Sequence, residues 1–223
     1  MVSGKELNFG ENFLLYLIDK LAPDVEKVRE WVKEVKKENP DLSNDQVAEY
    51  LSDRIVWLYT SQGAALALPG AIPGFGTVAQ IGTELSTVGV DLTLMVRNQT
   101  YLAFAIAECY GFTGREILIQ DTLICMGLWT NAVTLTKSGL VKLGTKAVEA
   151  NFKKKFPGAI LAAINRKVGT TVLTKYGTKR GGVAVGKLIP FGVGVVVGGG
   201  FNYLTMKNFA NSTRKYYSLK VGK

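Results

Sequence analysis

Two acidic side chains, Glu84 and Asp91, stand seven residues apart in a largely apolar part of the chain. Seven residues make almost two turns of an α-helix, so both carboxylates would lie on one face of the same helix. Such a pair could serve a hydrolase or transferase, with a divalent ion such as Mg²⁺ or Ca²⁺ held by oxygen atoms. The same spacing is common on helices without chemistry, so this enzymatic hypothesis is kept as the alternative.

Several residue types needed for other reactions are absent or unsuitably placed. The chain has no histidine, which removes the usual general base, the commonest metal ligand and histidine-activated nucleophiles. Cys109 and Cys125 lie in apolar segments without a CxxC pattern, so we interpret them as reduced core residues. The glycine strings match neither a phosphate loop nor a dinucleotide fingerprint. The sequence therefore favours a non-enzymatic protein, with no cofactor and no bound metal expected.

Two uncharged runs stand out, one of 29 residues from Ile55 to Thr83 and one of 19 residues from Leu188 to Met206. Each contains an Ile-Pro pair followed closely by Phe and Gly. Proline removes a backbone donor and keeps the preceding residue out of the α region, so the chain must break there into hairpins with apolar tips. The candidate contacts with a ligand or a membrane are Leu68, Pro69, Ile72, Pro73, Phe75, Glu84, Asp91, Arg97, Gln99, Lys187, Pro190, Phe191, Gly199 and Asn202.

Three amphipathic helices are expected to open the chain. Asn8 with Glu11 predicts a capping box for the first helix, and Pro23 is expected at the first position of the second. Ser43 with Gln46 predicts the cap of the third. Apolar stripes at helical spacing follow these starts, at Phe13, Leu14, Leu17, Ile18 and Leu21, at Val25, Val28, Val32 and Val35, and at Val47, Tyr50, Leu51, Ile55 and Leu58.

Two longer helices are expected in the middle of the chain. One runs from Val78 to about Cys109 and ends at Gly111, a typical helix-terminating residue. The next begins at Thr113 with Glu116 as a capping box and continues to about Thr136. Between them these helices would supply the long central elements of an all-α fold.

Polar residues of the first long helix fall on two lines. One contains Gln80, Glu84, Thr87, Asp91 and Asn98, and the other contains Arg97, Tyr101 and Glu108. One interpretation is a solvated face with a surface ion pair. The other is a polar seam that faces a helix or a cavity, where buried carboxylates would need partners.

Charge is divided unevenly along the chain. Residues 1–136 hold 10 Lys/Arg and 17 Asp/Glu, whereas residues 137–223 hold 17 Lys/Arg and one acid, so the net charges are −7 and +16. The basic part indicates an anionic partner such as phospholipid headgroups, or else an internal match with the acidic part. No nucleic-acid-binding signature accompanies it, so nucleic acid is not the expected partner.

The C-terminal segment alternates aromatic and basic residues: Tyr203, Lys207, Phe209, Arg214, Lys215, Tyr216, Tyr217 and Lys220. That mixture suits a membrane interface, where rings sit at headgroup level and lysines meet anionic lipid. The alternative is an amphipathic helix docked on the rest of the protein.

The complete pattern predicts an all-α, compact multi-helix bundle with long central helices and apolar hairpins opened by Pro and Gly. Residues 1–42 are expected to form an N-terminal helical extension and residues 43–223 the main helical domain. The first residues lack the basic and apolar regions of a secretory signal, so we expect a cytoplasmic protein at the inner face of the membrane.

The chain resembles the EcsC family of intracellular helical proteins over roughly residues 45–217. The motifs that carry the resemblance are Leu68-Pro69-Gly70 with the glycine-rich turn after it, Gln99 with Ile106-Ala107-Glu108-Cys109-Tyr110-Gly111, and Lys187-Leu188-Ile189-Pro190-Phe191-Gly192 followed by Gly198-Gly199-Gly200-Phe201-Asn202-Tyr203. The resemblance implies a helical fold and either membrane association or support of a transport system. It supplies no catalytic residues.

Our leading hypothesis is thus a peripheral membrane protein that dips an apolar hairpin into lipid or holds an acyl chain between helices. Its partner would be either an anionic membrane surface or a bound lipid or acyl chain, with a membrane transporter as a further candidate. A protein that inserts conditionally into the membrane is a further alternative. The sequence identifies neither the ligand nor the oligomeric state.

Overall fold

The computed structural model describes residues 13–62, 87–132, 161–162, 164–168 and 199–221. Its named helices are α1 (Phe13–Leu21), α2 (Val25–Glu38), α3 (Asn44–Gln62), α5 (Thr87–Cys109), α6 (Arg115–Trp129) and α9 (Gly199–Val221). No strand occurs in these ranges, so the predicted all-α class is confirmed.

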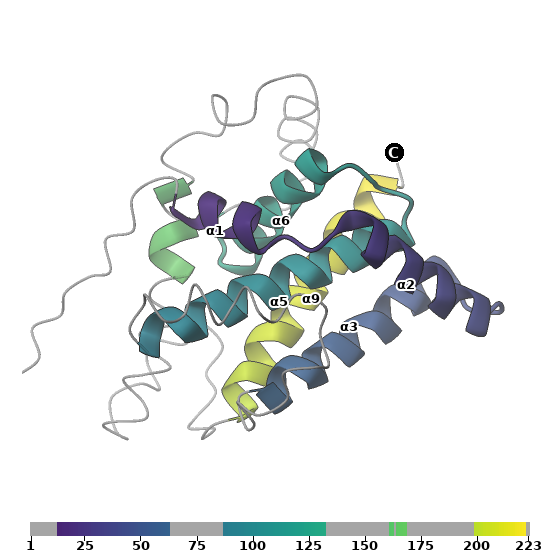
Figure 1. Cartoon of the computed structure of the whole chain (residues 1–223), viewed down its shortest axis with the longest axis horizontal. Coiled ribbons are helices and arrows are strands. Elements are labelled where there is room, and N and C mark those ends of the chain that lie inside the picture. The colour runs from purple at the N-terminus through teal and green to yellow at the C-terminus, as the bar shows by residue number, and fades with distance from the viewer. Residues whose placement is uncertain (1–12, 63–86, 133–160, 163, 169–198, 222–223) are drawn as a thin grey trace, which may run out of the picture.

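Helix α5 is the central element of the bundle. It packs against α1, α2, α3, α6 and α9, and Figure 1 shows it crossing the middle of the molecule. Helix α9, last in the chain, packs against α3, α5 and α6. The compact bundle with long central helices is therefore confirmed. The division at residue 42 stays a prediction; α1 and α2 both pack directly on α5.

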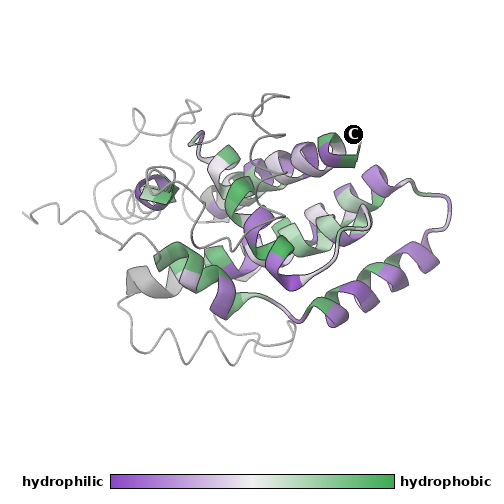
Figure 2. Cartoon of the chain, turned by 90° about the horizontal axis from the view of Figure 1, so that it is seen from above, coloured by the Kyte–Doolittle hydropathy of each residue, from purple (hydrophilic) through white to green (hydrophobic). Residues whose placement is uncertain are grey.

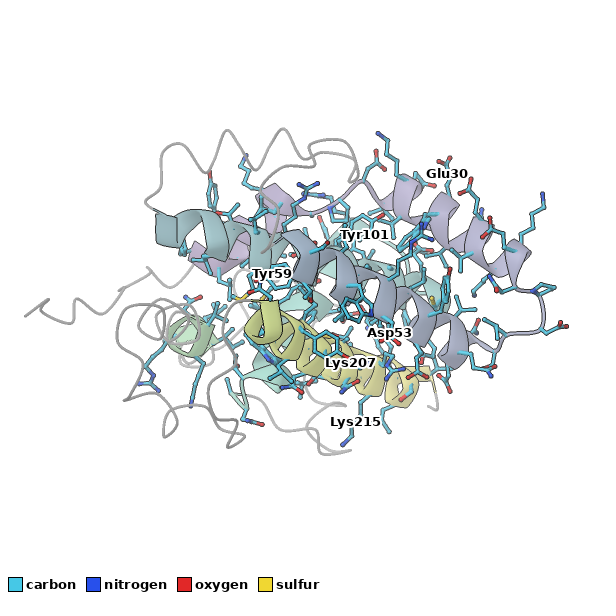
Figure 3. The ribbon with its side chains drawn as sticks, turned by 90° about the horizontal axis from the view of Figure 1, so that it is seen from below. Glu30, Asp53, Tyr59, Tyr101, Lys207 and Lys215 are labelled. Carbon is cyan, nitrogen blue, oxygen red and sulfur yellow. The ribbon has the colours of Figure 1, made fainter. Side chains whose placement is uncertain are left out.

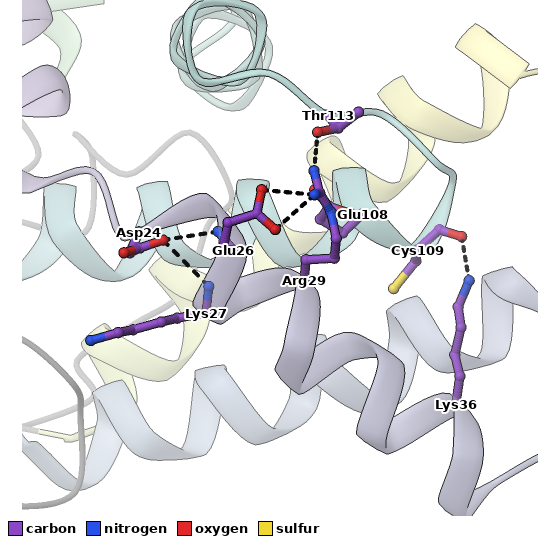
Figure 4. Close-up of polar contacts among 8 residues, drawn as sticks. All are labelled: Asp24, Glu26, Lys27, Arg29, Lys36, Glu108, Cys109 and Thr113. Atoms are coloured by element: carbon purple, nitrogen blue, oxygen red, sulfur yellow. Dashed lines mark hydrogen bonds and ion pairs between the residues drawn. The ribbon is translucent and has the colours of Figure 1, made fainter.

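Helix α2 shows how local signals place these helices. Asp24 is its N-cap, and the carboxylate accepts hydrogen bonds from the backbone N–H groups of Glu26 at 2.9 Å and Lys27 at 3.4 Å (Figure 4). Pro23 therefore precedes the cap, and its predicted place at the first helical position is wrong. The valine stripe behaves as expected: Val28, Val32 and Val35 are buried and Val25 is half-buried.

The start of α3 follows the predicted capping box. The backbone N–H of Ser43 donates to Oε1 of Gln46 at 2.9 Å, and the N–H of Gln46 donates back to Oγ of Ser43 at 3.3 Å. In Figure 2 the ribbon alternates between hydrophilic and hydrophobic colours along the helices at the edge of the bundle, as amphipathic helices do.

Helix α5 ends at the predicted place. Gly111 has a φ of 79°, the N–H of Phe112 donates to the carbonyl of Ala107 at 3.0 Å, and that of Gly111 to the carbonyl of Glu108 at 3.1 Å. These bonds form a Schellman motif, which satisfies carbonyl groups that the helix end leaves open. The predicted start of this helix at Val78 lies outside the described residues.

We expect Gly111→Ala to lower the free energy of unfolding by about 1–2 kcal/mol, because a side chain in the left-handed region is strained. A Cβ at this position would have no atom within 4 Å, so the cost is one of backbone conformation and not of steric contact. Denaturant unfolding measures the loss. Gly111→Asn should lose less, since asparagine adopts this conformation more readily; equal losses for both variants would contradict the explanation.

Two predictions for α6 are wrong. It begins at Arg115 after Gly114, which makes no side-chain cap bond, and the hydroxyl of Thr113 instead accepts a hydrogen bond from Arg29. It ends at Trp129 and not near Thr136, because Asn131 turns the chain with a φ of 58°. That turn is a second Schellman arrangement, in which the N–H of Ala132 donates to the carbonyl of Gly127 at 2.8 Å.

Candidate functional site

Most of the predicted ligand or membrane contacts lie outside the described residues. These are Leu68, Pro69, Ile72, Pro73, Phe75, Glu84, Lys187, Pro190 and Phe191. Asp91 belongs to α5 and Gly199 is the first residue of α9. The structure describes only the backbone of these two residues, so their surroundings are not described. The Glu84/Asp91 enzymatic alternative therefore stays a prediction.

Three of the predicted residues have described side chains, and all three are buried. Arg97 is 7% exposed, Gln99 is fully buried, and Asn202 is 3% exposed. Arg97 and Gln99 belong to the central helix α5, and Asn202 lies in the first turn of α9, which packs against α5. Burial at this level is compatible with a ligand inside the bundle, and not with direct contact between these side chains and a membrane surface.

The buried carboxamides of Gln99 and Asn202 are incompletely hydrogen-bonded. Within the part of the chain that the structure describes, neither Oε1 nor Nε2 of Gln99 has a hydrogen-bond partner, and the same holds for Oδ1 of Asn202. A buried polar group without a partner costs about 1–3 kcal/mol, so native proteins seldom keep one without a reason. These two side chains are the described residues best suited to receive a polar group.

Two residues of the second polar line, Tyr101 and Glu108, contact helix α2, and the third, Arg97, is buried. The ring of Tyr101 lies 5.6 Å from that of Trp31, and Nε of Arg29 lies 3.4 Å from Oε2 of Glu108. Burial lowers the pKa of Arg97 and raises the pKa of Tyr101. For these residues the seam interpretation is correct and the solvated face is wrong.

Arg29 is the centre of a polar cluster at the C-terminal end of α5 (Figure 4). Besides its contact with Glu108, the guanidinium donates hydrogen bonds to the carboxylate of Glu26 at 2.7 Å and to the hydroxyl of Thr113. The hydrogen bond to Glu108 raises the pKa of Arg29. Nearby, Nζ of Lys36 donates to the carbonyl of Cys109 at 2.9 Å, placing a cation at the negative end of the helix. The cluster holds α2 against the end of α5.

A second cluster, around Asp121, was missed from the sequence. Asp121 is 3% exposed. Its carboxylate accepts hydrogen bonds from the hydroxyls of Tyr216 at 2.6 Å and Tyr217 at 3.0 Å, and from Nζ of Lys220 at 2.7 Å and 2.9 Å. The charge of Asp121 adds to burial in raising the pKa of both tyrosines. One signal was available: Asp121 is the sole charged residue between Glu116 and Lys137.

Aromatic rings enclose the lysine of this cluster. Nζ of Lys220 lies 4.6 Å from the ring centroid of Phe112, 5.3 Å from that of Tyr216 and 5.8 Å from that of Tyr217. Such ring faces attract a cation. Asp121 belongs to α6, whereas Tyr216, Tyr217 and Lys220 belong to α9. These contacts therefore hold the two helices together.

Three aromatic residues of α9, Phe209, Tyr216 and Tyr217, do not form a membrane interface in this structure. Phe209 and Tyr217 are fully buried and Tyr216 is 1% exposed, so they belong to the core. The predicted interface is therefore wrong for these three residues, and the docked amphipathic helix is the correct alternative. Tyr203 is only half-buried.

Basic residues of α9 are matched by acids from the first half of the chain. Nζ of Lys207 lies 2.5 Å from Oδ1 of Asp53, and Nη1 of Arg214 lies 3.1 Å from Oε1 of Glu49. Figure 3 shows Lys207 and Asp53 facing each other between α9 and α3, whereas Lys215 points away from the bundle. With Lys220 bound to Asp121, the internal match describes α9 better than an anionic partner does.

Both cysteines are buried and free, as predicted. Burial raises the pKa of the Cys109 thiol to about 12 and raises that of Cys125 as well. A thiol reacts as its thiolate, so neither side chain is suited to nucleophilic chemistry in the folded protein.

No family model, curated protein or solved structure matches the chain. Among the described residues, no helix is both long and apolar enough to cross a membrane. The same residues contain no group of three or more Cys, Asp or Glu side chains that could hold a metal ion.

Proposed function

We propose that this chain is a non-enzymatic protein that binds a lipid or another ligand with an apolar body and a polar end, and that it works at the cytoplasmic face of a membrane. A relationship to the EcsC family, and with it the support of a membrane transport system, is part of the same proposal. The hairpins that the sequence predicts around Pro69 and Pro190, and the lysine-rich region before α9, would supply its contacts with lipid.

The observation that carries the proposal is the pair of incompletely hydrogen-bonded buried carboxamides, Gln99 and Asn202. They lie on α5 and α9, two helices in mutual contact, and each helix connects to one of the two uncharged runs. An amide group can both donate and accept hydrogen bonds, so it suits the ester or hydroxyl groups of a lipid. The apolar part of the ligand would then lie among the aliphatic side chains that fill the bundle.

Native mass spectrometry of the gently purified protein tests this function. We expect a bound species with the mass of a lipid or fatty acid, and its loss from the Gln99→Leu/Asn202→Leu variant. Without ligand the variant should be at least as stable as the parent, because leucine removes two incompletely bonded buried amides. Detection of the apo mass alone, for parent and variant alike, would contradict ligand binding.

Thr100→Val is the matched control for this experiment. Thr100 is the neighbour of Gln99 on α5 and is equally buried, but its hydroxyl already donates to the carbonyl of Val96 at 2.7 Å. We expect this variant to keep the ligand. If Thr100→Val lost it to the same extent, the effect would be one of local packing and not of the Gln99 amide.

A further inference from the structure

Helix α3 exposes two aromatic side chains on one side. Tyr50 is 44% exposed and Trp57 is 64% exposed, and Trp57 has the largest exposed fraction among the large hydrophobic residues that the structure describes. Seven residues rotate a helix by about 700°, which is within about 20° of two full turns, so the two rings share a face. Arg54, also exposed, lies between them.

Rings from neighbouring helices extend this surface. The ring centroid of Tyr203 on α9 lies 5.6 Å from that of Trp57, and the guanidinium of Arg54 lies 5.8 Å from the ring centroid of Trp31 on α2. We call Tyr50, Arg54, Trp57 and Tyr203 the α3 aromatic patch. Its residues belong to α3 and α9, which pack directly against each other, so its rings are presented on a rigid surface.

On the α9 side of the patch, acidic side chains of α3 form ion pairs with basic side chains of α9, so their charges are neutralised. Asp53 is bonded to Lys207 and Glu49 to Arg214, both across the boundary between α3 and α9. Arg54 remains as the charge between the two exposed rings. The patch therefore offers little net attraction to an anionic surface, and its binding energy must come from the rings.

Tryptophan and tyrosine favour the boundary between lipid headgroups and acyl chains, because each ring has an apolar body and a polar N–H or O–H group. A stable protein interface buries about 800 Å² per partner, far more than two exposed rings provide. The α3 residues of the patch span the middle of that helix, and the 29-residue uncharged run begins at Ile55, between Arg54 and Trp57. These features fit a bilayer surface better than a protein partner.

We propose that the α3 aromatic patch is a membrane-contact surface whose rings enter the headgroup region of a zwitterionic bilayer such as phosphatidylcholine. The inference rests on the membrane location in the proposed function and adds to it a specific surface. Contact through this patch does not require anionic lipid and is not reversed by salt.

Fluorescence of Trp57 as the sole tryptophan tests the contact. The Trp31→Phe/Trp129→Phe variant keeps Trp57 and removes the two half-buried tryptophans. With phosphatidylcholine vesicles we expect its emission to shift to the blue and to be quenched by brominated acyl chains, equally at low and high salt. Flotation of the whole chain with the vesicles is measured in parallel.

The outcomes separate the two proposals. If the chain floats with vesicles but Trp57 is not quenched, the patch inference is overturned and membrane association stands. Quenching that appears only with anionic vesicles, or that disappears in salt, also overturns the inference. If the chain floats with no vesicle of any composition, the inference and the membrane part of the proposed function both fail, whereas ligand binding is judged by the mass spectrum.

Matched alanine variants test the surface independently. Tyr50→Ala/Trp57→Ala should reduce vesicle partitioning by roughly tenfold, as expected for about 1.4 kcal/mol of lost binding energy. Tyr16→Ala removes a ring of intermediate exposure, 57% against 44% for Tyr50 and 64% for Trp57, from α1 and should leave partitioning unchanged. Equal losses for both variants, with circular dichroism showing both to be folded, would assign the effect to general surface hydrophobicity and overturn the proposal.

Discussion

Replacing Asp121 with alanine is expected to lower the free energy of unfolding by about 3–5 kcal/mol, because two buried hydroxyls lose their acceptor and Lys220 loses its ion-pair partner. Its carboxylate is the shared acceptor for Tyr216, Tyr217 and Lys220. The two tyrosines are 1% and 0% exposed, so their hydroxyls would lose their acceptor out of reach of water. Each orphaned hydroxyl costs about 1–3 kcal/mol. Lys220 keeps 20% side-chain exposure and can turn to solvent, so the tyrosines dominate the loss.

A double-mutant comparison separates the contribution of the tyrosine hydroxyls to this loss from that of Lys220. In a Tyr216→Phe/Tyr217→Phe background no tyrosine hydroxyl remains, so the further loss on Asp121→Ala should be clearly smaller than in the parent protein. Urea unfolding of the four proteins provides the comparison. An identical loss in both backgrounds would show that the ion pair with Lys220, and not the hydroxyls, is responsible. A loss below about 1 kcal/mol in the parent would contradict the structural role of the cluster.

The sequence predicted those features that depend on neighbours along the chain. The Ser43–Gln46 capping box and the valine stripe of α2 are set by residues three or four positions apart, within one helical turn. Gly111 was predictive because glycine adopts a positive φ without strain. Asn131 performs the same function at the end of α6 but is less characteristic of a helix end, so that end was placed too late.

Features that depend on distant residues could not be predicted in this way. Asp121 and Lys220 are 99 residues apart, and nothing in the local pattern of either helix selects the other as partner. Thr113 had the right spacing from Glu116 for a capping box, but Arg29, 84 residues away, engages its hydroxyl. At Thr113 a tertiary contact overrode a local pattern, and at Asp121 there was no local pattern to interpret.

The candidate site shows the same division. Burial of Gln99 was not evident from its position among polar neighbours, because it depends on the packing of α5 against α1, α2, α3, α6 and α9, most of which are distant in sequence. Composition suggested that the rings of α9 would face lipid, yet Tyr216 and Tyr217 lie on its buried face. The residue types of α9 indicated which kinds of surface it could contact. Which of its side chains are buried depends on the helices packed against it, and the sequence of α9 alone does not show that.

Phe209→Ala is expected to lower the free energy of unfolding by about 3–5 kcal/mol, because a large ring leaves a cavity that the bundle can fill only in part. Phe209 is fully buried on α9, and its ring meets that of Trp129 on α6 edge to face, with the centroids 6.3 Å apart. Native domains are stable by about 5–15 kcal/mol, so this one change would remove a large fraction of the total. Thermal and denaturant unfolding measure it.

Trp57→Ala is the control that gives this prediction its meaning. Both changes remove an aromatic ring, but Trp57 is 64% exposed and Phe209 is not exposed at all. We therefore expect Trp57→Ala to change the free energy of unfolding by no more than about 0.5–1 kcal/mol. Should the two variants lose stability equally, Trp57 would be a core residue of the protein in solution, and the α3 aromatic patch would not be available to a membrane. A large loss of unfolding free energy for Phe209→Ala, with a small loss for Trp57→Ala, supports different roles for the two rings. Phe209 of α9 stabilises the bundle, whereas Trp57 of α3 is exposed and available to a membrane.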